Sequence, residues 1–408
     1  MNLFFIFVVL ASIGVIARLM QNLAVRASIL KNSIVPEADI LTDTSKQTPR
    51  SGATSASGKP SPNGFYPPLS ILKPLKGLDE DLFGNLISFC NQDYPNYEII
   101  FALEEATDPA LTVAHKIKKI YPHKKISIVI KKKDYALNPK VNNLIAAYEA
   151  SQFPYILISD SDVRVDHNYL REITRPLKDP RVGVVSNLIR GVGSRTLGSL
   201  LENLHLNSFV IGNVALLTWL FKMPVIVGKS LVMSKVALEA IGGFAAVKDV
   251  LAEDYIIGLL MRDKGKDVIT SSYVVNAVNK HRTMSQFCQR HSRWGKMRWK
   301  MVGIRYISEL ISNAVFMACL SLVLVGPSAR TIALVAAASL LTVMGDYWLG
   351  RQIRSAHHLG HYLLTPLKDI FIGYMWFVPF FNQRVKWRRH TYKITKGSYL
   401  VPLPDEKI

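Results

Sequence analysis

Residues 155–162 read Tyr-Ile-Leu-Ile-Ser-Asp-Ser-Asp, and this stretch decides the fold class that the sequence predicts. Its apolar part is typical of a buried strand, and the two acids mark the point where that strand leaves the core. Two carboxylates two residues apart at a strand end are suited to holding a divalent cation, which in turn neutralises a pyrophosphate. A solvated strand-end turn is the alternative for so short a motif, so the interpretation depends on the surrounding sequence.

Strands and helices alternate along the chain before this stretch. The predicted strands are 69–72, 97–103 and 126–130, and the predicted helices are 82–89, 111–120 and 142–150. Such alternation is typical of an α/β fold with a mostly parallel sheet and helices on both faces. Ligands of these sheets bind at the carboxyl ends of the strands. We therefore predict an α/β domain over residues 68–300, with its chemistry at the strand ends.

Two further segments carry candidate functional side chains. Asn138-Pro139-Lys140 precedes a helix and places an ammonium near the same sheet edge, where it suits either a phosphate contact or a surface turn. Glu253 and Asp254 begin an apolar helical run. Acids at this position either complement the helix dipole or supply a general base, which is a carboxylate within hydrogen-bond reach of a hydroxyl nucleophile.

A third candidate segment contains Arg290, Arg293 and Trp294. On a helix these three side chains share one face. Two guanidiniums suit the oxygens of a phosphate, and the indole suits an apolar part of a substrate. The alternative is a basic helix at a membrane surface with an interfacial Trp.

The first apolar stretch predicts a membrane anchor at residues 1–22. A cleaved signal peptide has its basic residues before the apolar run, whereas Arg18, Arg26 and Lys31 lie late in this stretch or after it. These charges place the rest of the chain in the cytoplasm. Residues 23–67 include a run rich in Ser, Thr, Pro, Gly and Lys, and this composition predicts a flexible linker.

Further apolar blocks predict membrane segments in the C-terminal third. Residues 305–350 are expected to form a membrane hairpin, because two apolar runs with basic flanks are separated by a short Gly-Pro-containing break. Lys368 and Asp369 interrupt residues 362–382, and ionisable groups are costly in mid-bilayer, so this block favours a re-entrant or interfacial segment over the alternative of a fourth crossing. A basic tail at 383–408 follows.

The composition supports a membrane protein and excludes other classes. The 408 residues carry a formal charge of +20 and are 49% hydrophobic. Basic residues beside membrane segments attract anionic lipid head groups. They form no nucleic-acid-binding motif, so nucleic acid is excluded as a partner. Three scattered cysteines build neither a disulfide framework nor a zinc site, and they indicate a reducing compartment.

Seven motifs over residues 68–300 resemble, in their order and spacing, the ceramide glucosyltransferase family. They are Lys73-Pro74-Leu75-Lys76-Gly77, Asp93-Tyr94-Pro95, Asp108-Pro109-Ala110, Asn138-Pro139-Lys140, Asp160-Ser161-Asp162, Glu253-Asp254 and Arg290-x-x-Arg293-Trp294. The resemblance implies a nucleotide-sugar-binding fold of the GT-A type, an N-terminal anchor, a cytosolic catalytic domain and C-terminal membrane segments.

The resemblance also implies roles on the donor side. Asp160 and Asp162 would bind a divalent cation, Mg²⁺ or Mn²⁺, and with it the UDP-sugar donor, while Lys140 would approach the donor phosphates. Where the family has an Asp that contacts the uridine, this chain has Glu105. The longer side chain shifts the carboxylate by about 1.5 Å, which leaves the donor affinity and the donor identity open.

On the acceptor side, the resemblance implies that Asp254 is the base that deprotonates a lipid hydroxyl. Arg290, Arg293 and Trp294 would close over the pyrophosphate and the acceptor. A single base opposite a metal-held leaving group implies one direct displacement, so an α-linked UDP-sugar gives a β-glycoside. The expected reaction is the transfer of glucose from UDP-glucose to the hydroxyl of a ceramide-type lipid at a membrane.

Three alternative functions stay open. Bacterial relatives of this family transfer N-acetylglucosamine from UDP-N-acetylglucosamine to a hopanoid polyol with a similar membrane layout. A processive polysaccharide synthase shares the acidic motifs but usually needs more crossings than this sequence predicts. A non-enzymatic membrane scaffold is favoured only by Glu105. The C-terminal tail carries no obvious organelle signal, which favours a bacterial inner membrane over an endoplasmic reticulum or Golgi membrane.

Overall fold

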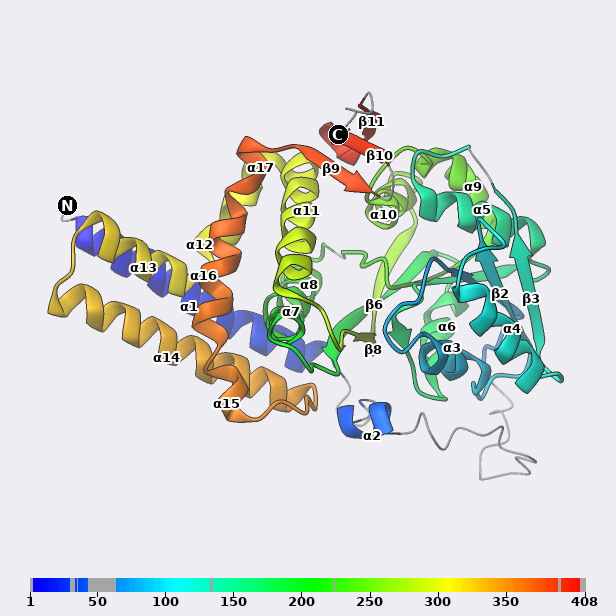
Figure 1. The fold of residues 1–408 in the computed structure, drawn as a ribbon, viewed down its shortest axis with the longest axis horizontal. Coiled ribbons are helices and arrows are strands. Elements are labelled where there is room, and N and C mark those ends of the chain that lie inside the picture. Colours follow the sequence, from blue (N-terminus) through cyan, green and yellow to red (C-terminus); the bar gives the residue numbers. More distant parts are fainter. Residues whose placement is uncertain are drawn as a thin grey trace. The chain divides into compact units, whose positions relative to one another are not determined.

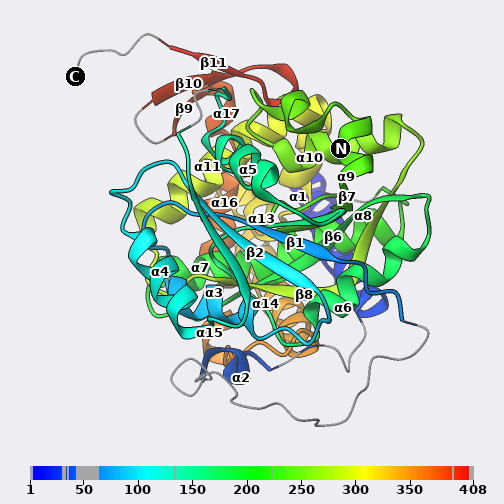
Figure 2. The ribbon, with the colours of Figure 1, turned by 90° about the vertical axis from the view of Figure 1, so that its right-hand side faces the viewer.

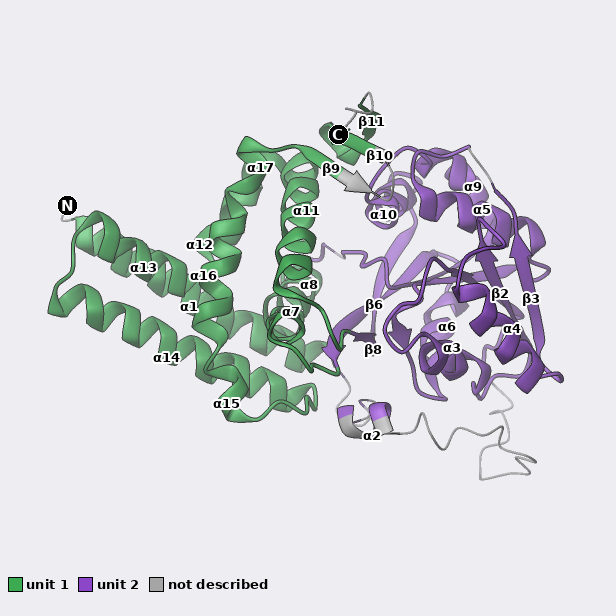
Figure 3. Ribbon diagram, viewed as in Figure 1, with its two compact units in different colours: residues 1–28, 193–221, 279–408 green, residues 29–192, 222–278 purple. Residues whose placement is uncertain are grey.

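The computed structural model of the chain divides into two compact units (Figure 3). It describes residues 3–29, 34, 36–42, 64–132, 135–223, 225–387 and 390–403. Unit 1 consists of residues 1–28, 193–221 and 279–408, and unit 2 consists of residues 29–192 and 222–278. Most of the predicted linker lies outside the described residues, which include one short helix of it, α2 (Glu37–Thr42).

Unit 2 begins with the alternation that the sequence predicts. Its first elements are β1 (Leu69–Pro74), α3 (Leu82–Cys90), β2 (Tyr97–Leu103), α4 (Ala110–Ile120), β3 (Lys125–Ile130), α5 (Pro139–Ala150) and β4 (Tyr155–Ser159). The strands β3, β2, β1 and β4 are neighbours in that order and pair in parallel. Every residue of β1 and β2 is buried, as expected for central strands covered on both faces. The predicted α/β fold is confirmed.

The second half of unit 2 adds antiparallel pairs to this sheet. Its elements are β5 (Val163–Arg164), α6 (Tyr169–Thr174), η2 (Arg175–Lys178), β6 (Val182–Val192), β7 (Ser230–Ser234), α9 (Lys235–Ala240), η4 (Gly243–Val247), α10 (Glu253–Asp263) and β8 (Asp267–Val278). Within the described residues, eight strands form one sheet in the order β3-β2-β1-β4-β7-β6-β8-β5, and β7 is antiparallel to both of its neighbours. Helices α5, α9 and α10 lie on one side of the sheet, and α3, α4 and α6 lie on the other (Figures 1 and 2). The sheet is therefore mixed.

Unit 1 is built mainly from helices. They are α1 (Leu3–Ser28), α7 (Leu197–His205), the π-helical turn η3 (Leu206–Val210), α8 (Ile211–Trp219), α11 (Met284–Val302), η5 (Gly303–Tyr306), α12 (Ile307–Ile311), α13 (Ala314–Leu324), α14 (Ala329–Gln352), α15 (Leu359–Tyr362), α16 (Thr365–Trp376) and α17 (Val378–Phe381). Helix α1 packs against α8, α13 and α14. The tail adds a small antiparallel sheet of β9 (Arg384–Trp387), β10 (His390–Ile394) and β11 (Leu400–Pro402), with the turn η6 (Lys396–Ser398).

Several helices of unit 1 are long and apolar enough to cross a membrane. Among the described residues there are three, Leu3–Ser28, Leu197–Trp219 and Ala329–Gln352. A fourth is counted if Met284–Ile311 and Ala314–Leu324, bent by 74° at their break, form one span. These helices indicate membrane association.

The membrane segments overlap the predicted ones with two differences. The predicted anchor lies in α1, which continues to Ser28, and the predicted hairpin corresponds to α12, α13 and α14. Residues 193–221 and 279–300, within the range predicted for the catalytic domain, belong to unit 1. The predicted re-entrant segment is the short run of α15, α16 and α17. The predicted domain boundaries stay predictions.

Four charged side chains meet inside the helices of unit 1. Arg18 of α1 contacts Asp346 of α14 and Asp369 of α16, each at 3.4 Å. The ammonium of Lys368 lies 3.0 Å from Asp346 and 3.1 Å from Asp369. The exposed fraction of each of these side chains is 7% or less. Two cations and two carboxylates therefore balance one another, which explains how Lys368 and Asp369 are accommodated in an apolar segment.

Candidate active site

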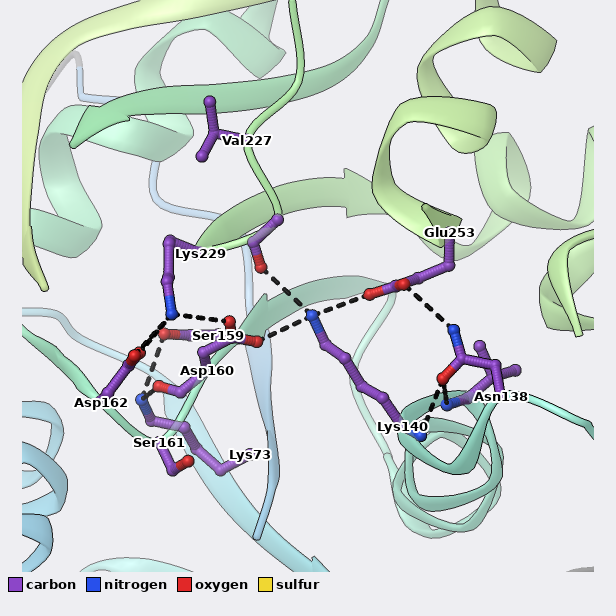
Figure 4. A network of polar contacts seen from close by, with 12 residues as sticks. Lys73, Asn138, Lys140, Ser159, Asp160, Ser161, Asp162, Val227, Lys229 and Glu253 are labelled. Atoms are coloured by element: carbon purple, nitrogen blue, oxygen red, sulfur yellow. Dashed lines mark hydrogen bonds and ion pairs between the residues drawn. The ribbon is translucent and has the colours of Figure 1, made fainter. Parts of the chain in front are cut away.

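The candidate site lies in unit 2 at the carboxyl end of β4. Asp160 and Asp162 follow this strand directly, and the parallel pairing of β1, β2 and β4 brings the carboxyl ends of those strands to one edge. The ammonium of Lys229 lies 3.2 Å from Asp160 and 2.6 Å from Asp162 (Figure 4). Both acids predicted to bind a cation therefore face a positive charge of the protein itself.

Lys140 bridges Asp160, which follows β4, and Glu253 at the start of α10. Its ammonium lies 2.7 Å from Asp160 and 2.8 Å from Glu253, and it donates a hydrogen bond to the carbonyl oxygen of Gly228 at 3.3 Å (Figure 4). Burial opposes the charged form of Lys140, but the Asp160 and Glu253 carboxylates outweigh it and raise the pKa of Lys140 above its usual value. Lys140 therefore lies beside Asp160, and its predicted contact with the donor phosphates stays a prediction.

The start of α5 fixes this lysine in place. The side chain of Asn138 caps the helix, with its Oδ1 accepting hydrogen bonds from the backbone N–H groups of Lys140 and Val141 at 2.9 and 3.3 Å. Its Nδ2 donates to Glu253 at 3.1 Å and to the carbonyl of Val250 at 2.9 Å. Asn138 therefore ties the N-termini of α5 and α10 together.

A second lysine supports the strand end from within the core. Lys73 of β1 is fully buried and donates to Ser159 at 3.1 Å and to the carbonyl oxygen of Asp160 at 2.8 Å. Its ammonium also lies 3.5 Å from the centre of the Phe89 ring. Burial lowers the pKa of Lys73 to about 7. These contacts hold the backbone that carries Asp160.

Asp254 shares this electrostatic environment from the first turn of α10. Burial, followed by the neighbouring Glu253 carboxylate, raises the pKa of Asp254 to about 7, and Lys140 opposes the shift. Gly228 leaves room for this carboxylate, because a Cβ atom at that position would lie 2.5 Å from its Oδ2 atom. A carboxylate of this kind is half-protonated near neutral pH, which suits a group that accepts and releases a proton.

The acids of β4 fit a divalent cation. Burial favours the neutral form of Asp160, but Lys140 and Lys229 outweigh it and hold the pKa of Asp160 well below its usual range. The Lys229 ammonium occupies the space between the two carboxylates as a cation does. In the described part of the chain, this site included, no group of three or more His, Cys, Asp and Glu side chains gathers that could hold a metal ion by itself. Asp160 and Asp162 would hold the ion, with donor phosphate oxygens completing its shell.

Three predicted residues belong to unit 1, on α11. The Arg290 guanidinium lies 4.6 Å from the centre of the Trp294 ring, so these two side chains share a face as predicted. Arg290 also contacts the buried Glu202 at 3.4 Å. Arg293 is half-buried on the same helix. The structure thus brings together the candidates of unit 2 and, separately, those of α11, and the roles predicted for the α11 residues stay predictions.

Glu105 is exposed in the loop after β2, at the sheet edge where β4 ends. The neighbouring Asp108 has a structural role, because its buried carboxylate accepts hydrogen bonds from the backbone N–H groups of Gly77 and Ala110, both at 2.9 Å. The Asp108-Pro109-Ala110 motif therefore shapes the loop that carries Glu105. The contact of Glu105 with a nucleotide stays a prediction.

Sequence reasoning did not assign three residues of the network. Lys229 stands in the segment Gly228-Lys229-Ser230, which resembles the acceptor-side region of the family, and nothing in the sequence pairs it with Asp162. Glu253 precedes the predicted base, and only the structure shows that it binds Lys140. Lys73 belongs to a motif of the family resemblance, and its position inside a buried strand was the available signal.

The fold and the acids at the end of β4 define a GT-A-like α/β glycosyltransferase. A mannosyltransferase from Pyrobaculum calidifontis, solved with GDP-mannose and Mn²⁺, shares this fold with a TM-score of 0.51. The match covers 88% of this chain and 99% of the other at 17% sequence identity.

The chain belongs to glycosyl transferase family 21, whose sequence model matches residues 41–400. Ceramide glucosyltransferase 1 of Caenorhabditis elegans is 26% identical over 263 residues, which span 63% of this chain and 55% of the relative. Ceramide glucosyltransferase 3 of the same organism is 24% identical over 345 residues, or 82% of this chain and 74% of the relative. The ceramide glucosyltransferase of Komagataella phaffii is 39% identical over 103 residues, a fifth of its length.

Proposed function

We propose that the protein transfers glucose, with inversion, from UDP-glucose to the hydroxyl of a ceramide-type lipid. The observation that carries this proposal is the Asp254 carboxylate, whose pKa is raised to about 7 beside the Lys140–Asp160 ion pair. The family and its ceramide glucosyltransferase relatives support the reaction class and the acceptor.

The donor side follows from the acids of β4. A solved structural neighbour carries a nucleotide sugar and Mn²⁺, which supports a nucleotide-sugar donor and a divalent cation here. A cation held by Asp160 and Asp162 would neutralise negative charge on the leaving diphosphate. Lys140 lies beside Asp160 and adds a fixed positive charge, and we assign Glu105, at the same sheet edge, to the nucleoside. Arg290, Arg293 and Trp294 are assigned to the pyrophosphate and the acceptor.

The acceptor side follows from Asp254. Its carboxylate takes the proton of the lipid hydroxyl as the oxygen attacks the anomeric carbon of the sugar. The C–O bond to the sugar forms as the bond to the diphosphate breaks, so the nucleotide leaves with the electron pair and the configuration inverts. Fixed positive charges at the leaving group stabilise the negative charge that develops there.

The membrane helices of unit 1 support a lipid substrate. They give the enzyme access to an acceptor that does not leave the bilayer. The basic residue in the last turn of α1, Arg26, supports our assignment of unit 2 to the cytoplasmic side. We assign the protein to a bacterial inner membrane.

The test is an assay on purified membranes with labelled UDP-glucose or UDP-N-acetylglucosamine against ceramide, diacylglycerol and a hopanoid polyol. We expect labelled glucosylceramide. Asp254→Asn should abolish transfer while donor binding survives, and Asp263→Asn, an exposed acid at the other end of α10, should be as active as the wild type. If the labelled product is an N-acetylglucosaminyl hopanoid, the donor and the acceptor proposed here are wrong. Full turnover by Asp254→Asn would refute the assignment of Asp254 as the base.

A further inference from the structure

Unit 1 contains an open cavity at the break between α12 and α13. The centres of water-sized molecules can occupy about 30 Å³ of it, and the wider empty volume of about 520 Å³ includes open solvent. Residues of α1, η3, α11, α12 and α16 contribute to its walls. It lies wholly within unit 1 and shares no residue with the acid cluster of unit 2.

The break between α12 and α13 supplies two polar residues to this cavity. Helix α12 ends at Ile311, α13 begins at Ala314, and Ser312 and Asn313 between them line the cavity. Ser312 donates to the carbonyl of Glu309, and Asn313 donates to the carbonyl of Asp369, both at 2.8 Å. Non-helical backbone at membrane depth is tolerated where it is buried in protein or lines a polar cavity. The hydrogen bonds of Ser312 and Asn313 therefore stabilise the break between α12 and α13.

The charged groups at the cavity are already paired. Arg18 contacts Asp346 and Asp369, and Arg298 contacts Glu309 at 2.8 Å. Each cation in the walls thus has a carboxylate partner, and no excess positive charge is left to hold a phosphate. The walls favour an uncharged polar group over an anionic one.

Two histidines supply polar atoms that lack partners. His205 of α7 and His291 of α11 are 2% and 3% exposed, and their rings meet edge to face with centroids 4.7 Å apart. Within the described residues, the Nδ1 atom of each has no hydrogen-bond partner. Buried polar atoms in native proteins are almost always hydrogen-bonded, so two unpaired imidazole nitrogens at one cavity point to a ligand.

Aromatic side chains complete the walls. Phe209 stacks on His205 with ring centroids 5.3 Å apart, and Tyr306 stacks on Trp376 at 5.1 Å. All four side chains line the cavity. Flat apolar surfaces beside a few hydrogen-bonding atoms are typical of small-molecule sites.

We propose that this cavity binds the uncharged polar head of a lipid, through hydrogen bonds between its hydroxyl or amide groups and the imidazoles of His205 and His291. The inference rests on the proposed function, and it identifies the lipid as the acceptor. It selects neutral lipids with hydroxyl or amide groups and rejects phospholipids, because the nearby charges are compensated. The proposal thereby assigns recognition of the acceptor lipid to unit 1 and catalysis of glycosyl transfer to unit 2.

The test is photo-crosslinking of the purified full-length protein in detergent with a diazirine-bearing ceramide, without any nucleotide sugar. We expect label on peptides that contain residues 205–209 and 306–313. Unlabelled ceramide should compete, and phosphatidylglycerol should not. His205→Phe keeps the ring stack but removes both nitrogens, so the ceramide should bind about three- to tenfold more weakly.

Two further variants separate recognition from packing. His205→Gln keeps a hydrogen-bonding group and should recover part of the lost binding. Met344→Leu changes an exposed apolar side chain of α14 that does not line the cavity, and this variant should bind as the wild type does. Label outside these peptides, competition by phosphatidylglycerol, or equal losses in His205→Phe and Met344→Leu would each overturn the proposal. Specific binding with no glycosyl transfer would overturn the proposed function alone.

Discussion

Gly228→Ala changes the room available to the Asp254 carboxylate without touching that residue. A Cβ atom at position 228 would lie 2.5 Å from Oδ2 and 3.0 Å from Cγ of Asp254. Ordinary contact begins at 3.4 Å, so the carboxylate oxygen must move by about 0.9 Å. The moving atoms are the end of a side chain, so the fold should tolerate the change.

The expected loss is in catalysis. A misplacement of about 1 Å at a reacting group lowers rates by about a hundredfold, which corresponds to about 2.7 kcal/mol of transition-state stabilisation. We therefore expect kcat to fall by about two orders of magnitude, with the thermal midpoint and the donor affinity close to those of the wild type.

The assay is the steady-state rate of glycolipid formation, together with a melting curve and donor titration. Gly360→Ala is the matched control, because a Cβ atom at Gly360 meets nothing within 4 Å. If Gly228→Ala retains the kcat of Gly360→Ala, the position of Asp254 does not govern the reaction and its assignment as the base is refuted.

Three other predictions address separate parts of the molecule. Burial and Glu253 raise the pKa of Asp254 to about 7, and a base acts only when it is deprotonated. We therefore expect kcat/KM to fall about tenfold per pH unit below pH 7 and to level off above pH 7. A flat pH profile of kcat/KM between pH 5.5 and 8 would contradict this. Glu105→Gln alters an exposed side chain, so stability should change by less than about 0.5 kcal/mol while the KM for the donor rises severalfold; an unchanged KM would exclude Glu105 from the donor site. Arg18→Met leaves two buried carboxylates with one cation and should lower the free energy of unfolding in detergent by about 3–5 kcal/mol. Arg26→Met, at an exposed position, should leave it unchanged. Equal melting of both variants would show that the ion pairs do not stabilise the fold.

The first half of unit 2 could be predicted because its signals are local. Strands β1, β2 and β4 are mainly apolar, and breaks and helical patterns separate them. The acids after β4 were predicted for the same reason, since a strand end is visible in the sequence. Lys229 and Glu253 were harder to predict, because Lys229 reaches Asp160, and Glu253 reaches Lys140, from distant segments.

Other features depend on tertiary packing that the sequence does not display. The insertion of β7 between β4 and β6 is a matter of sheet order, and its five residues carry no mark of their direction. The helical segment Leu197–Trp219 has a mean hydropathy of only 1.2 and contains Glu202 and His205, so its apolar pattern is weak. Its polar residues are instead accommodated by contacts with α11, such as the 3.0 Å contact between Glu202 and His291.

The balanced charges inside unit 1 constrain the order of biogenesis. Arg18 leaves the ribosome early, whereas Asp369 follows it 351 residues later in the chain. During that interval the first helix enters the bilayer with a guanidinium whose carboxylate partners have not been synthesised, and a lone charge at that depth is unfavourable. The nascent chain therefore has to keep α1 near the translocon or the bilayer surface until α14 and α16 arrive, so release of a finished enzyme depends on completion of its last helices.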